Sequence, residues 1–357
     1  MEIKGSRSAC FAEDVVEILS RLPVKSLLRF MCVSKEWHAL IKSSYFTAVH
    51  LQRSDSNLLL LFSRKKVNEG LIYTISLLRN ESTHLSLDLP FINCPSMHWL
   101  GPAGSSSGLV CLKKSDILSQ CIVVWNPATK QFRFLPETDD YYLLGFEFFH
   151  DIRDYKVVSI LQPDLNNTIR AKVFTGNTNS WREVKSHYCC SSRPFFLGTS
   201  RSITLNGVLY SPLWIQEQRS HVLSFNLRDE VFHVIPLPES SSTDRMKLLS
   251  WKNSLAFIGG PEYEPLGEIW VMTEEPSAGT AQITWVKQFI LEPSALPGYI
   301  LGSWKDEYLL GDNYFSYELY CYDPAIQKSA RLPQLVETDR YSYYKAINYV
   351  ESLASVD

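Results

Sequence analysis

Residues 122–136 read IVVWNPATKQFRFLP, which is an apolar run, a polar turn and a second run that carries aromatic residues. Short β-type runs on both sides of turn residues predict two paired strands. Similar units return along the chain, and their turns begin at Gly176, Asn226, Met272 and Asp323. Counted from Asn126, the intervals between turns are 50, 50, 46 and 51 residues. A period near 50 is typical of the blades of a kelch-type propeller.

Each unit is preceded by another strand that opens with a turn. These upstream turns begin at Gly108, Asn206, Asn253 and Asp306, which is 17 to 20 residues before the downstream turns. So steady a spacing predicts a repeated four-stranded blade. Residues 58–62 and 71–78 supply one more blade, so we expect an all-β propeller of about six blades. A two-sheet sandwich with accidental regularity is the alternative.

The first fifty residues have a helical pattern instead. Apolar residues of 15–22 recur at i, i+3, i+4 and i+7, and Pro23 ends this helix because it lacks an amide donor. Residues 24–31 repeat the spacing, and Ser34 is the expected N-cap of a third helix. Helices this short bury little surface, yet they carry many large apolar side chains. The module therefore either docks on a partner chain or caps the domain that follows. No further helix is expected after Ser44.

Two stretches of this module carry a family resemblance. Residues 13–30, EDVVEILSRLPVKSLLRF, and residues 32–37, CVSKEW, resemble the F-box of plant F-box proteins. The family usually opens its F-box with Leu-Pro, where this chain has Phe11-Ala12. The resemblance implies that residues 8–48 form an F-box, which binds a Skp-type adaptor and through it a cullin scaffold.

The repeats resemble the F-box-associated domain, which is itself similar to kelch repeats. The motifs that carry this resemblance are WNPAT at 125–129, DYKVV at 154–158, SW at 180–181, IWVM at 269–272 and YVESL at 349–353. The expected class is thus α+β and multidomain: a small three-helix F-box, then a kelch-like propeller over residues 55–353. The S-locus-F-box-like group of flowering plants is the most similar group, and it would imply pistil ribonucleases as substrates.

The function that these resemblances imply is a receptor without catalysis of its own. The chain would be the substrate-recognition subunit of an SCF-type ubiquitin ligase, and its propeller would hold a target protein for ubiquitination and proteasomal degradation. The implied adaptor-binding residues are Phe11, Leu19, Leu22, Pro23, Leu27, Val33 and Trp37. Trp37 has an alternative role, which is to hold the three helices together. Two other functions stay open: a propeller enzyme with a helical lid, and a non-degradative scaffold.

Few sequence patterns indicate a catalytic or metal-binding site. The eight cysteines include no C-x-x-C pair, which excludes zinc ribbons and RING fingers, and the eight histidines show no metal-binding spacing. Residues 104–108, GSSSG, fit the G-x-S-x-G nucleophile elbow, but a strand follows them where that motif needs a helix, so we expect a loop. No catalytic residue, metal or cofactor is predicted.

Charge and hydropathy limit the classes of partner and the cellular compartment that we expect. The net charge of −3 argues against a general nucleic-acid binder. The most concentrated apolar stretch is far shorter than the about 20 residues that span a bilayer. Acidic residues interrupt the N-terminal segment, which therefore does not resemble a secretory signal. We expect a protein of the cytoplasm or nucleus with free thiols, and neither a nucleic acid nor a membrane as its partner.

Overall fold

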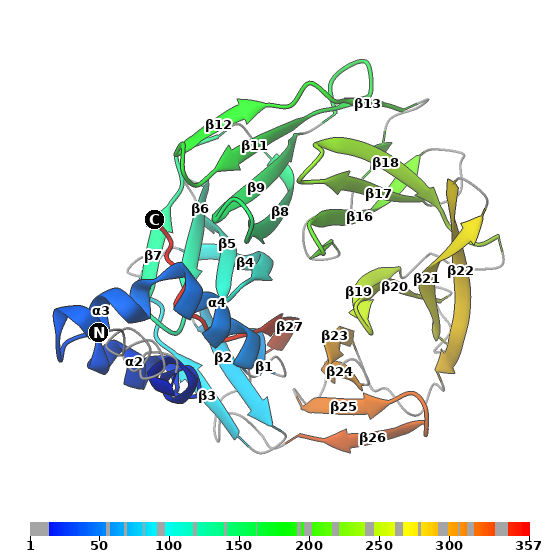
Figure 1. Cartoon of the computed structure of the whole chain (residues 1–357). Helices are drawn as coiled ribbons and strands as arrows, with labels where there is room; N and C mark the ends of the chain where they lie inside the picture. The colour runs from blue at the N-terminus through cyan, green and yellow to red at the C-terminus, as the bar shows by residue number, and fades with distance from the viewer. Residues whose placement is uncertain are drawn as a thin grey trace.

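The described chain forms short helices followed by a ring of six β-sheets (Figure 1). The structure is a computed structural model and describes residues 14–357 apart from 55–57, 68–69, 81–82, 91–96, 117–119, 139–140, 162, 191–193, 196–201, 216–220, 240–245, 261–266, 278–279, 292–298, 306–307, 313–317 and 333–341. Each sheet is one blade of a propeller. The predicted class, helices and then an all-β propeller of about six blades, is confirmed.

The helices begin where the sequence provides a cap or a stop. Residues 14–19 are helical, and the helix α2 (Val24–Phe30) starts directly after Pro23. Ser34 caps α3 (Lys35–Lys42), since its hydroxyl accepts a hydrogen bond from the Trp37 amide at 3.2 Å. Each hydroxyl cap satisfies an amide that the helix itself leaves unpaired. The predicted N-cap is therefore confirmed.

The expectation of no helix beyond Ser44 is wrong. The helix α4 spans Ser44–Arg53, and the hydroxyl of Ser43 caps it by accepting from the Phe46 amide at 3.2 Å. This segment contains Tyr, Phe, Thr and Val, which favour strands by intrinsic preference. Tertiary packing overrides that preference, because Phe46 and His50 are both buried against the other helices.

In blades one to three, four antiparallel strands follow one another outward from the propeller axis. Blade one consists of β27 (Ser342–Tyr349), β1 (Leu58–Val67), β2 (Gly70–Asn80) and β3 (Thr83–Leu87). Blade two consists of β4 (Met97–Ser106), β5 (Leu109–Asp116), β6 (Gln120–Asn126) and β7 (Gln131–Phe134). Blade three consists of β8 (Tyr141–Phe149), β9 (Asp154–Leu161), β11 (Ala171–Thr175) and β12 (Ser180–Glu183). A small sheet of β10 (Thr168–Ile169) and β13 (Tyr188–Cys189) extends from blade three.

Blades four to six follow the same order. Blade four consists of β14 (Pro194–Phe195) and β15 (Ile203–Leu205), which both pair with β16 (Val208–Ile215), followed by β17 (His221–Asn226) and β18 (Val231–Pro236). Blade five consists of β19 (Lys247–Trp251), β20 (Ser254–Gly259), β21 (Gly267–Ser277) and β22 (Thr280–Leu291). Blade six consists of β23 (Tyr299–Trp304), β24 (Tyr308–Asp312), β25 (Leu319–Asp323) and β26 (Lys328–Arg331). The innermost strands β27, β4, β8, β15, β19 and β23 contact one another around the axis.

The apolar strands are buried on both faces, because each lies between two neighbouring blades. On β1, Leu58, Leu60 and Phe62 pack in a cluster with blade two, whereas Leu59 and Leu61 pack in a cluster with blade six. Successive side chains of a strand point to opposite faces, so a strand buried on both sides reads as a continuous apolar run. The uniform run at 58–62 is therefore the consequence of blade stacking.

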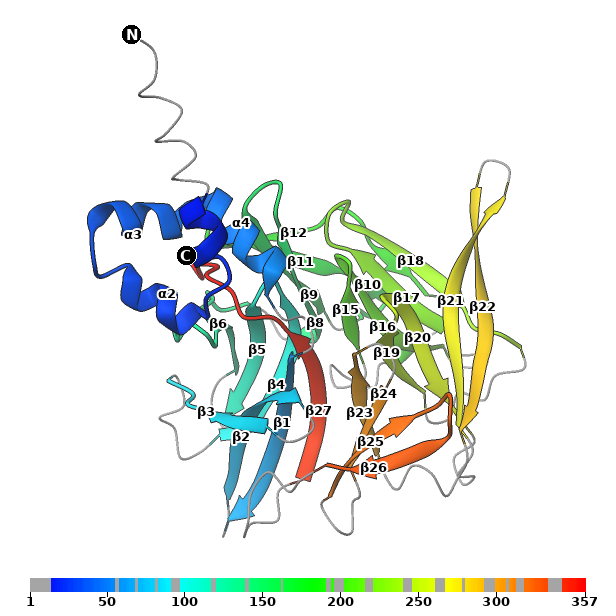
Figure 2. The same ribbon diagram turned by 60° about the horizontal axis from the view of Figure 1, so that its bottom comes forward.

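The ring closes between the two ends of the propeller sequence. The C-terminal strand β27 pairs with β1, in a register that joins Leu58 to Tyr349 and Leu60 to Ile347. This pairing places the C-terminal strand of the propeller in the same sheet as its first three strands, and it covers the inner edge of β1, which would otherwise be open to aggregation. Beyond β27 the chain runs back to the helices, as Figure 2 shows.

Four of the five predicted repeat turns lie at the end of a blade's third strand, and one does not. Met272 is inside β21, paired with Trp285, and the hairpin continues to the pair Ser277 and Thr280. The prediction of a turn at Met272 is therefore wrong. Side chains extend the pairing past Met272, since the hydroxyls of Thr273 and Thr284 lie 2.8 Å apart across the two strands.

Candidate functional site

The helical module has a small core of its own. Val16, Leu19, Leu27, Ile41 and Phe46 are buried together, and each helix contributes to this cluster. The end of α4 is joined to the first helix, because the Arg53 guanidinium donates to the Ser20 hydroxyl at 2.6 Å and forms an ion pair with Glu17. These contacts make the module one packed unit that includes α4.

The predicted adaptor-binding residues occupy different environments. Leu19 and Leu27 lie inside the module core, at 3% and 0% exposure. Leu22 and Trp37 are half-buried against that core, and Pro23 and Val33 are exposed; Phe11 lies outside the described residues. Trp37 packs edge-on against Phe30 with ring centroids 5.3 Å apart, which fits the alternative role of holding the helices together. Adaptor contact by this set stays a prediction.

Three large apolar side chains of the module point to solvent. Ile18, Val33 and Tyr45 are exposed to 64%, 67% and 64%, and we call them the exposed apolar set. Val33 lies in the α2–α3 connection, at the end of the module farthest from the propeller (Figure 2). Large exposed apolar groups on a small module are typical of an interaction surface.

Sequence reasoning missed Ile18 and Tyr45 as exposed residues. The apolar spacing of residues 15–22 places Ile18 on the same helical face as Leu19 and Leu22. In the structure the buried residues of this helix are Val16 and Leu19, which are three positions apart, so Ile18 faces away from the core. The signal was the surplus of apolar residues around the helix, since more are present than one face can bury.

The C-terminal tail, residues 350–357, is bonded to the propeller. The Asn126 side-chain amide donates to the backbone oxygens of Ser352 and Ala354 at 3.1 and 2.8 Å, and the Tyr155 hydroxyl donates to that of Val356 at 3.0 Å. The Ser352 hydroxyl donates to the Ser107 carbonyl at 2.6 Å. Such bonds between buried groups hold an otherwise irregular segment in one path.

Gly108 permits this close approach of the tail. Its φ of +80° is in the left-handed region, which glycine adopts at little cost. A Cβ at this position would lie 2.2 Å from the Ser352 hydroxyl and 2.7 Å from the Val350 carbonyl oxygen. The β4–β5 turn therefore accommodates the tail only because residue 108 has no side chain.

The same tail contacts the helical module. Leu353 packs against the module core, while Val356, three residues further, is buried in a propeller cluster. Figure 1 shows the end of the chain next to α4 and the strands of blade two. The tail therefore connects the module to the propeller on a path separate from the covalent link after α4.

We expect acid to destabilise the module through His50. Its ring Nε2 lies 3.0 Å from the Leu22 carbonyl oxygen, and burial lowers its pKa, which the Leu22 bond and the charge of Glu351 partly oppose. A His with a lowered pKa stabilises the fold at pH above its unfolded value of about 6.5, and this stabilisation is lost as the pH falls below it. Between pH 7.5 and 5.5, His50→Gln should reduce the fall in Tm by about 2 °C or more, measured by circular dichroism.

The control for this prediction is His38→Gln, at an exposed position of α3. It should melt with the pH dependence of the unmodified protein, because its side chain is exposed and lies outside the module core. Equal pH dependence of Tm in His50→Gln and the unmodified protein would show that His50 does not contribute to the destabilisation by acid.

The G-S-S-S-G segment is the end of β4 and the β4–β5 turn. It does not connect a strand to a helix, as a nucleophile elbow does. The Ser107 hydroxyl lies 2.9 Å from Nε2 of the exposed His150, and the carbonyl of Ser107 is bonded to the tail. Within the described ranges, no group of three His, Cys, Asp or Glu side chains could hold a metal ion.

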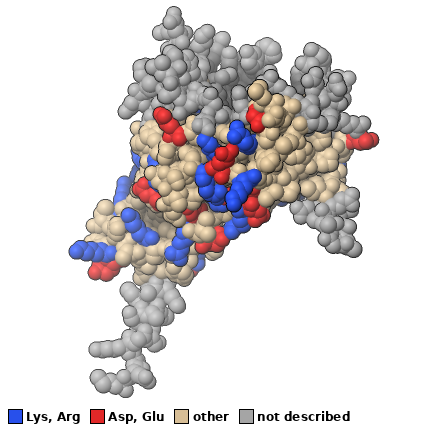
Figure 3. Space-filling model, turned by 90° about the horizontal axis from the view of Figure 1, so that it is seen from above, with Lys and Arg blue, Asp and Glu red and all other residues tan. Residues whose placement is uncertain are grey.

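Charged groups of both signs lie side by side on the outer face of blades three and four (Figure 3). Glu230 pairs with Lys156 at 2.9 Å and with Arg182, and Arg228 holds Asp151 with two bonds of 2.7 and 2.9 Å. These ion pairs join neighbouring blades, so they contribute to blade packing and do not form a field of one sign.

No helix among the described residues has the length and apolar content needed to cross a bilayer.

Comparisons with known proteins match both parts of the chain. Residues 13–48 match the model of the F-box domain, and residues 57–299 match the F-box associated beta propeller domain. The second match covers more than half of the chain. This chain belongs to the plant F-box proteins with an F-box-associated propeller.

Two relatives of this F-box protein come from Arabidopsis thaliana and are themselves named as F-box proteins. One is 32% identical over 241 residues, which are 63% of this chain and 59% of the relative. The other is 30% identical over 287 residues, which are 75% of this chain and 70% of the relative. The matched part of the F-box protein thus spans less than two thirds of the first relative.

The fold alone is shared with a more distant structure. TolB from Acinetobacter baumannii aligns with a TM-score of 0.50 at 8% identity, over 84% of this chain and 72% of TolB. At such low identity the likeness is limited to the propeller architecture.

Proposed function

We propose that this F-box protein is the substrate-recognition subunit of an SCF-type ubiquitin ligase. Its helical module would bind a Skp-type adaptor, which bridges to a cullin scaffold, and the propeller would bind the target protein. The exposure of Ile18, Val33 and Tyr45 on a module that is already packed supports the first part most directly. These side chains are available to a partner chain that would cover them.

The mechanism that fits this architecture is proximity. The C-terminal tail bonds to the propeller and packs on the module, so a target on the propeller would keep a fixed distance to an adaptor on the module. Holding a target lysine beside a charged conjugating enzyme raises its effective concentration, and no chemistry is required from this chain. Ubiquitination and proteasomal degradation would follow from the other subunits, in the cytoplasm or nucleus.

The adaptor contact would use Leu22, Pro23, Val33 and Trp37 of the predicted set, together with Ile18 and Tyr45. Leu19 and Leu27 would support this surface from the core, since both are buried. The S-locus-like placement and pistil ribonucleases as substrates stay predictions, and the proposal does not depend on them.

The test is assembly with purified components. The full chain mixed with a recombinant Skp-type adaptor and the N-terminal part of a cullin should elute as one complex with one copy of each, measured by size exclusion with light scattering. Elution of the chain alone at micromolar concentration would contradict the adaptor assignment. If the complex forms but the half-lives of propeller-bound proteins do not depend on this chain, a scaffold function replaces the degradative one.

A further inference from the structure

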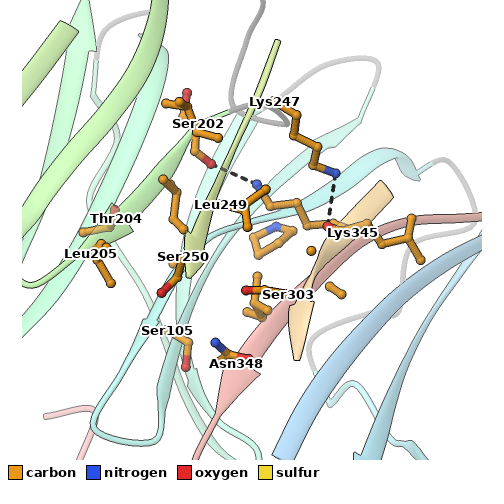
Figure 4. A pocket seen from close by; sticks show the side chains of 18 of the residues that line it. Ser105, Ser202, Thr204, Leu205, Lys247, Leu249, Ser250, Ser303, Lys345 and Asn348 are labelled. Carbon is orange, nitrogen blue, oxygen red and sulfur yellow. Dashed lines mark hydrogen bonds between the residues drawn. The ribbon is translucent and has the colours of Figure 1, made fainter. Parts of the chain in front are cut away.

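A cavity of about 380 Å³ lies on the propeller axis (Figure 4). The innermost strands β4, β15, β19, β23 and β27 provide its walls, so five of the six blades contribute to it. Its volume falls within the range of about 300–1,000 Å³ that is typical of small-molecule pockets. None of the lining residues belongs to the helical module, so the cavity is not part of the proposed adaptor surface.

The lining is cationic. Lys247, Lys305 and Lys345 line it from three different blades, the Lys305 ammonium lies 4.3 Å from the centre of the Trp304 ring, and the described lining residues include no Asp or Glu. Low-dielectric walls around charges of one sign concentrate the electrostatic field inside a cleft. The cavity therefore favours anions over neutral or cationic molecules.

Backbone carbonyl groups accept hydrogen bonds from two of these lysines. The Lys345 ammonium donates to the Ser202 carbonyl at 2.9 Å, which connects blade one to blade four across the axis. The Lys247 ammonium donates to the carbonyls of Leu301, at 3.1 Å, and of Ile300. Both lysines have further interactions as well.

The side chain of Lys345 is surrounded by protein, and its burial lowers the pKa to about 8. Its accessible surface is nevertheless intermediate, because part of the side chain faces the space inside the cavity. A positive charge in such surroundings is poorly solvated, and an anion bound next to it would offset that cost.

Polar groups line the rest of the cavity, below the lysines in the view of Figure 4. Thr204, Ser250 and Ser303 place hydroxyls along the cavity, and the side chains of Asn253 and Asn348 are exposed at the end where the inner strands turn outward. Hydroxyl and amide groups both donate and accept hydrogen bonds. The cavity therefore has a cationic inner end, a polar wall and an open rim.

We propose that the axial cavity binds a small polar organic anion, with a carboxylate or phosphate group at the inner end next to Lys345 and Lys247. The hydroxyls of Ser250 and Ser303 would hold the uncharged part of the ligand. This site goes beyond the proposed function and does not depend on it, because the proposed adaptor contact uses residues of the helical module and the cavity is lined by the propeller. Its volume of about 380 Å³ fits a free small molecule.

The experiment is calorimetric titration of the full chain with citrate, inorganic pyrophosphate and, as a neutral probe, glycerol. At least one anion should bind with a Kd of about 1 mM or tighter, and glycerol should not bind. Lys345→Met and Lys247→Met should each weaken anion binding by about tenfold or more. The matched control is Lys328→Met, an exposed lysine on β26, which should leave the Kd within about twofold.

A measurement on the unmodified chain keeps the proposal testable if the variants fail to fold. Bound anion should slow acetylation of Lys345 and Lys247 but not of Lys328, detected by mass spectrometry of the peptides. Three results would overturn the proposal: binding of neither anion, equal weakening by Lys328→Met, or Lys345-dependent binding of an oligoglutamate peptide without binding of the small anions. The last result would assign the site to a protein partner. Because no adaptor is present, these outcomes are separate from those that test the proposed function.

Discussion

The double variant Ile18→Asp/Val33→Asp is expected to lose about 100-fold or more in affinity for a Skp-type adaptor, which corresponds to about 2.7 kcal/mol. Both side chains are about two-thirds exposed in the free chain. A carboxylate at these positions is solvated in the free chain and would be desolvated, without a partner, in an apolar interface. The stability of the free chain should change by less than about 1 kcal/mol, since exposed substitutions rarely matter to the fold. Surface plasmon resonance with immobilised adaptor measures the affinity.

The chain offers a closely matched control for the first of these residues. Ile326 is 63% exposed, against 64% for Ile18, but it lies in the β25–β26 turn of the propeller. Ile326→Asp adds the same charge at the same exposure and should bind the adaptor normally. Equal loss in Ile326→Asp, or full binding by the double variant, would remove the exposed apolar set from the adaptor contact.

Asn126→Asp is expected to detach the C-terminal tail and to lower the free energy of unfolding by about 2–4 kcal/mol at pH 7. Asn126 is fully buried, and its amide nitrogen is the donor to the carbonyls of Ser352 and Ala354. Aspartate preserves the oxygen that accepts from the amides of Ala128 and Thr129, so the turn itself is retained. The substitution removes the donor and places a carboxylate against two carbonyl oxygens.

Two measurements report the loss of stability and the detachment of the tail. Chemical denaturation gives the loss of stability, and hydrogen exchange should show lower protection in the peptide that contains Leu353 and in the module core that it contacts. Both effects have one cause, because the tail joins the propeller to the module.

Asn226 provides the control, since it occupies the same repeat position in blade four. Its side-chain oxygen also accepts from two turn amides, those of Arg228 and Asp229, but its amide nitrogen donates to Asp229 and not to the tail. Asn226→Asp should cost less than about 1 kcal/mol, because the group is partly exposed. Similar costs for the two variants would show that the tail bonds contribute little.

The repeat turns show what sequence reasoning can predict. The turn at Asn126 was visible in the motif at 125–129, and its Asx geometry follows from a side chain that bonds to amides two and three residues ahead. The second role of Asn126 was not visible, because its partners lie 226 and 228 residues away. Local preferences predict the turn, and long-range contacts cannot be inferred from them.

The two wrong predictions, for the segment after Ser44 and for the turn at Met272, have the same origin. The segment 44–53 resembles a strand by composition and forms a helix, because Phe46 completes the module core. The turn expected at Met272 is absent, because cross-strand pairing extends the hairpin to Ser277. In both places contacts with another helix or strand outweigh a local preference that is worth less than about 1 kcal/mol per residue.

Residue pattern alone was enough to predict the helical module, the blades and their number, since period, caps and apolar runs are properties of neighbouring residues. Chain folding determined three further features: which apolar side chains of the module stay in solvent, the bridge that the tail forms between module and propeller, and the axial cavity where Lys247 and Lys345 meet. The first depends on how the helices pack on one another, and the other two depend on groups that are far apart along the chain and adjacent only after the ring has closed, so no local window of residues contains them.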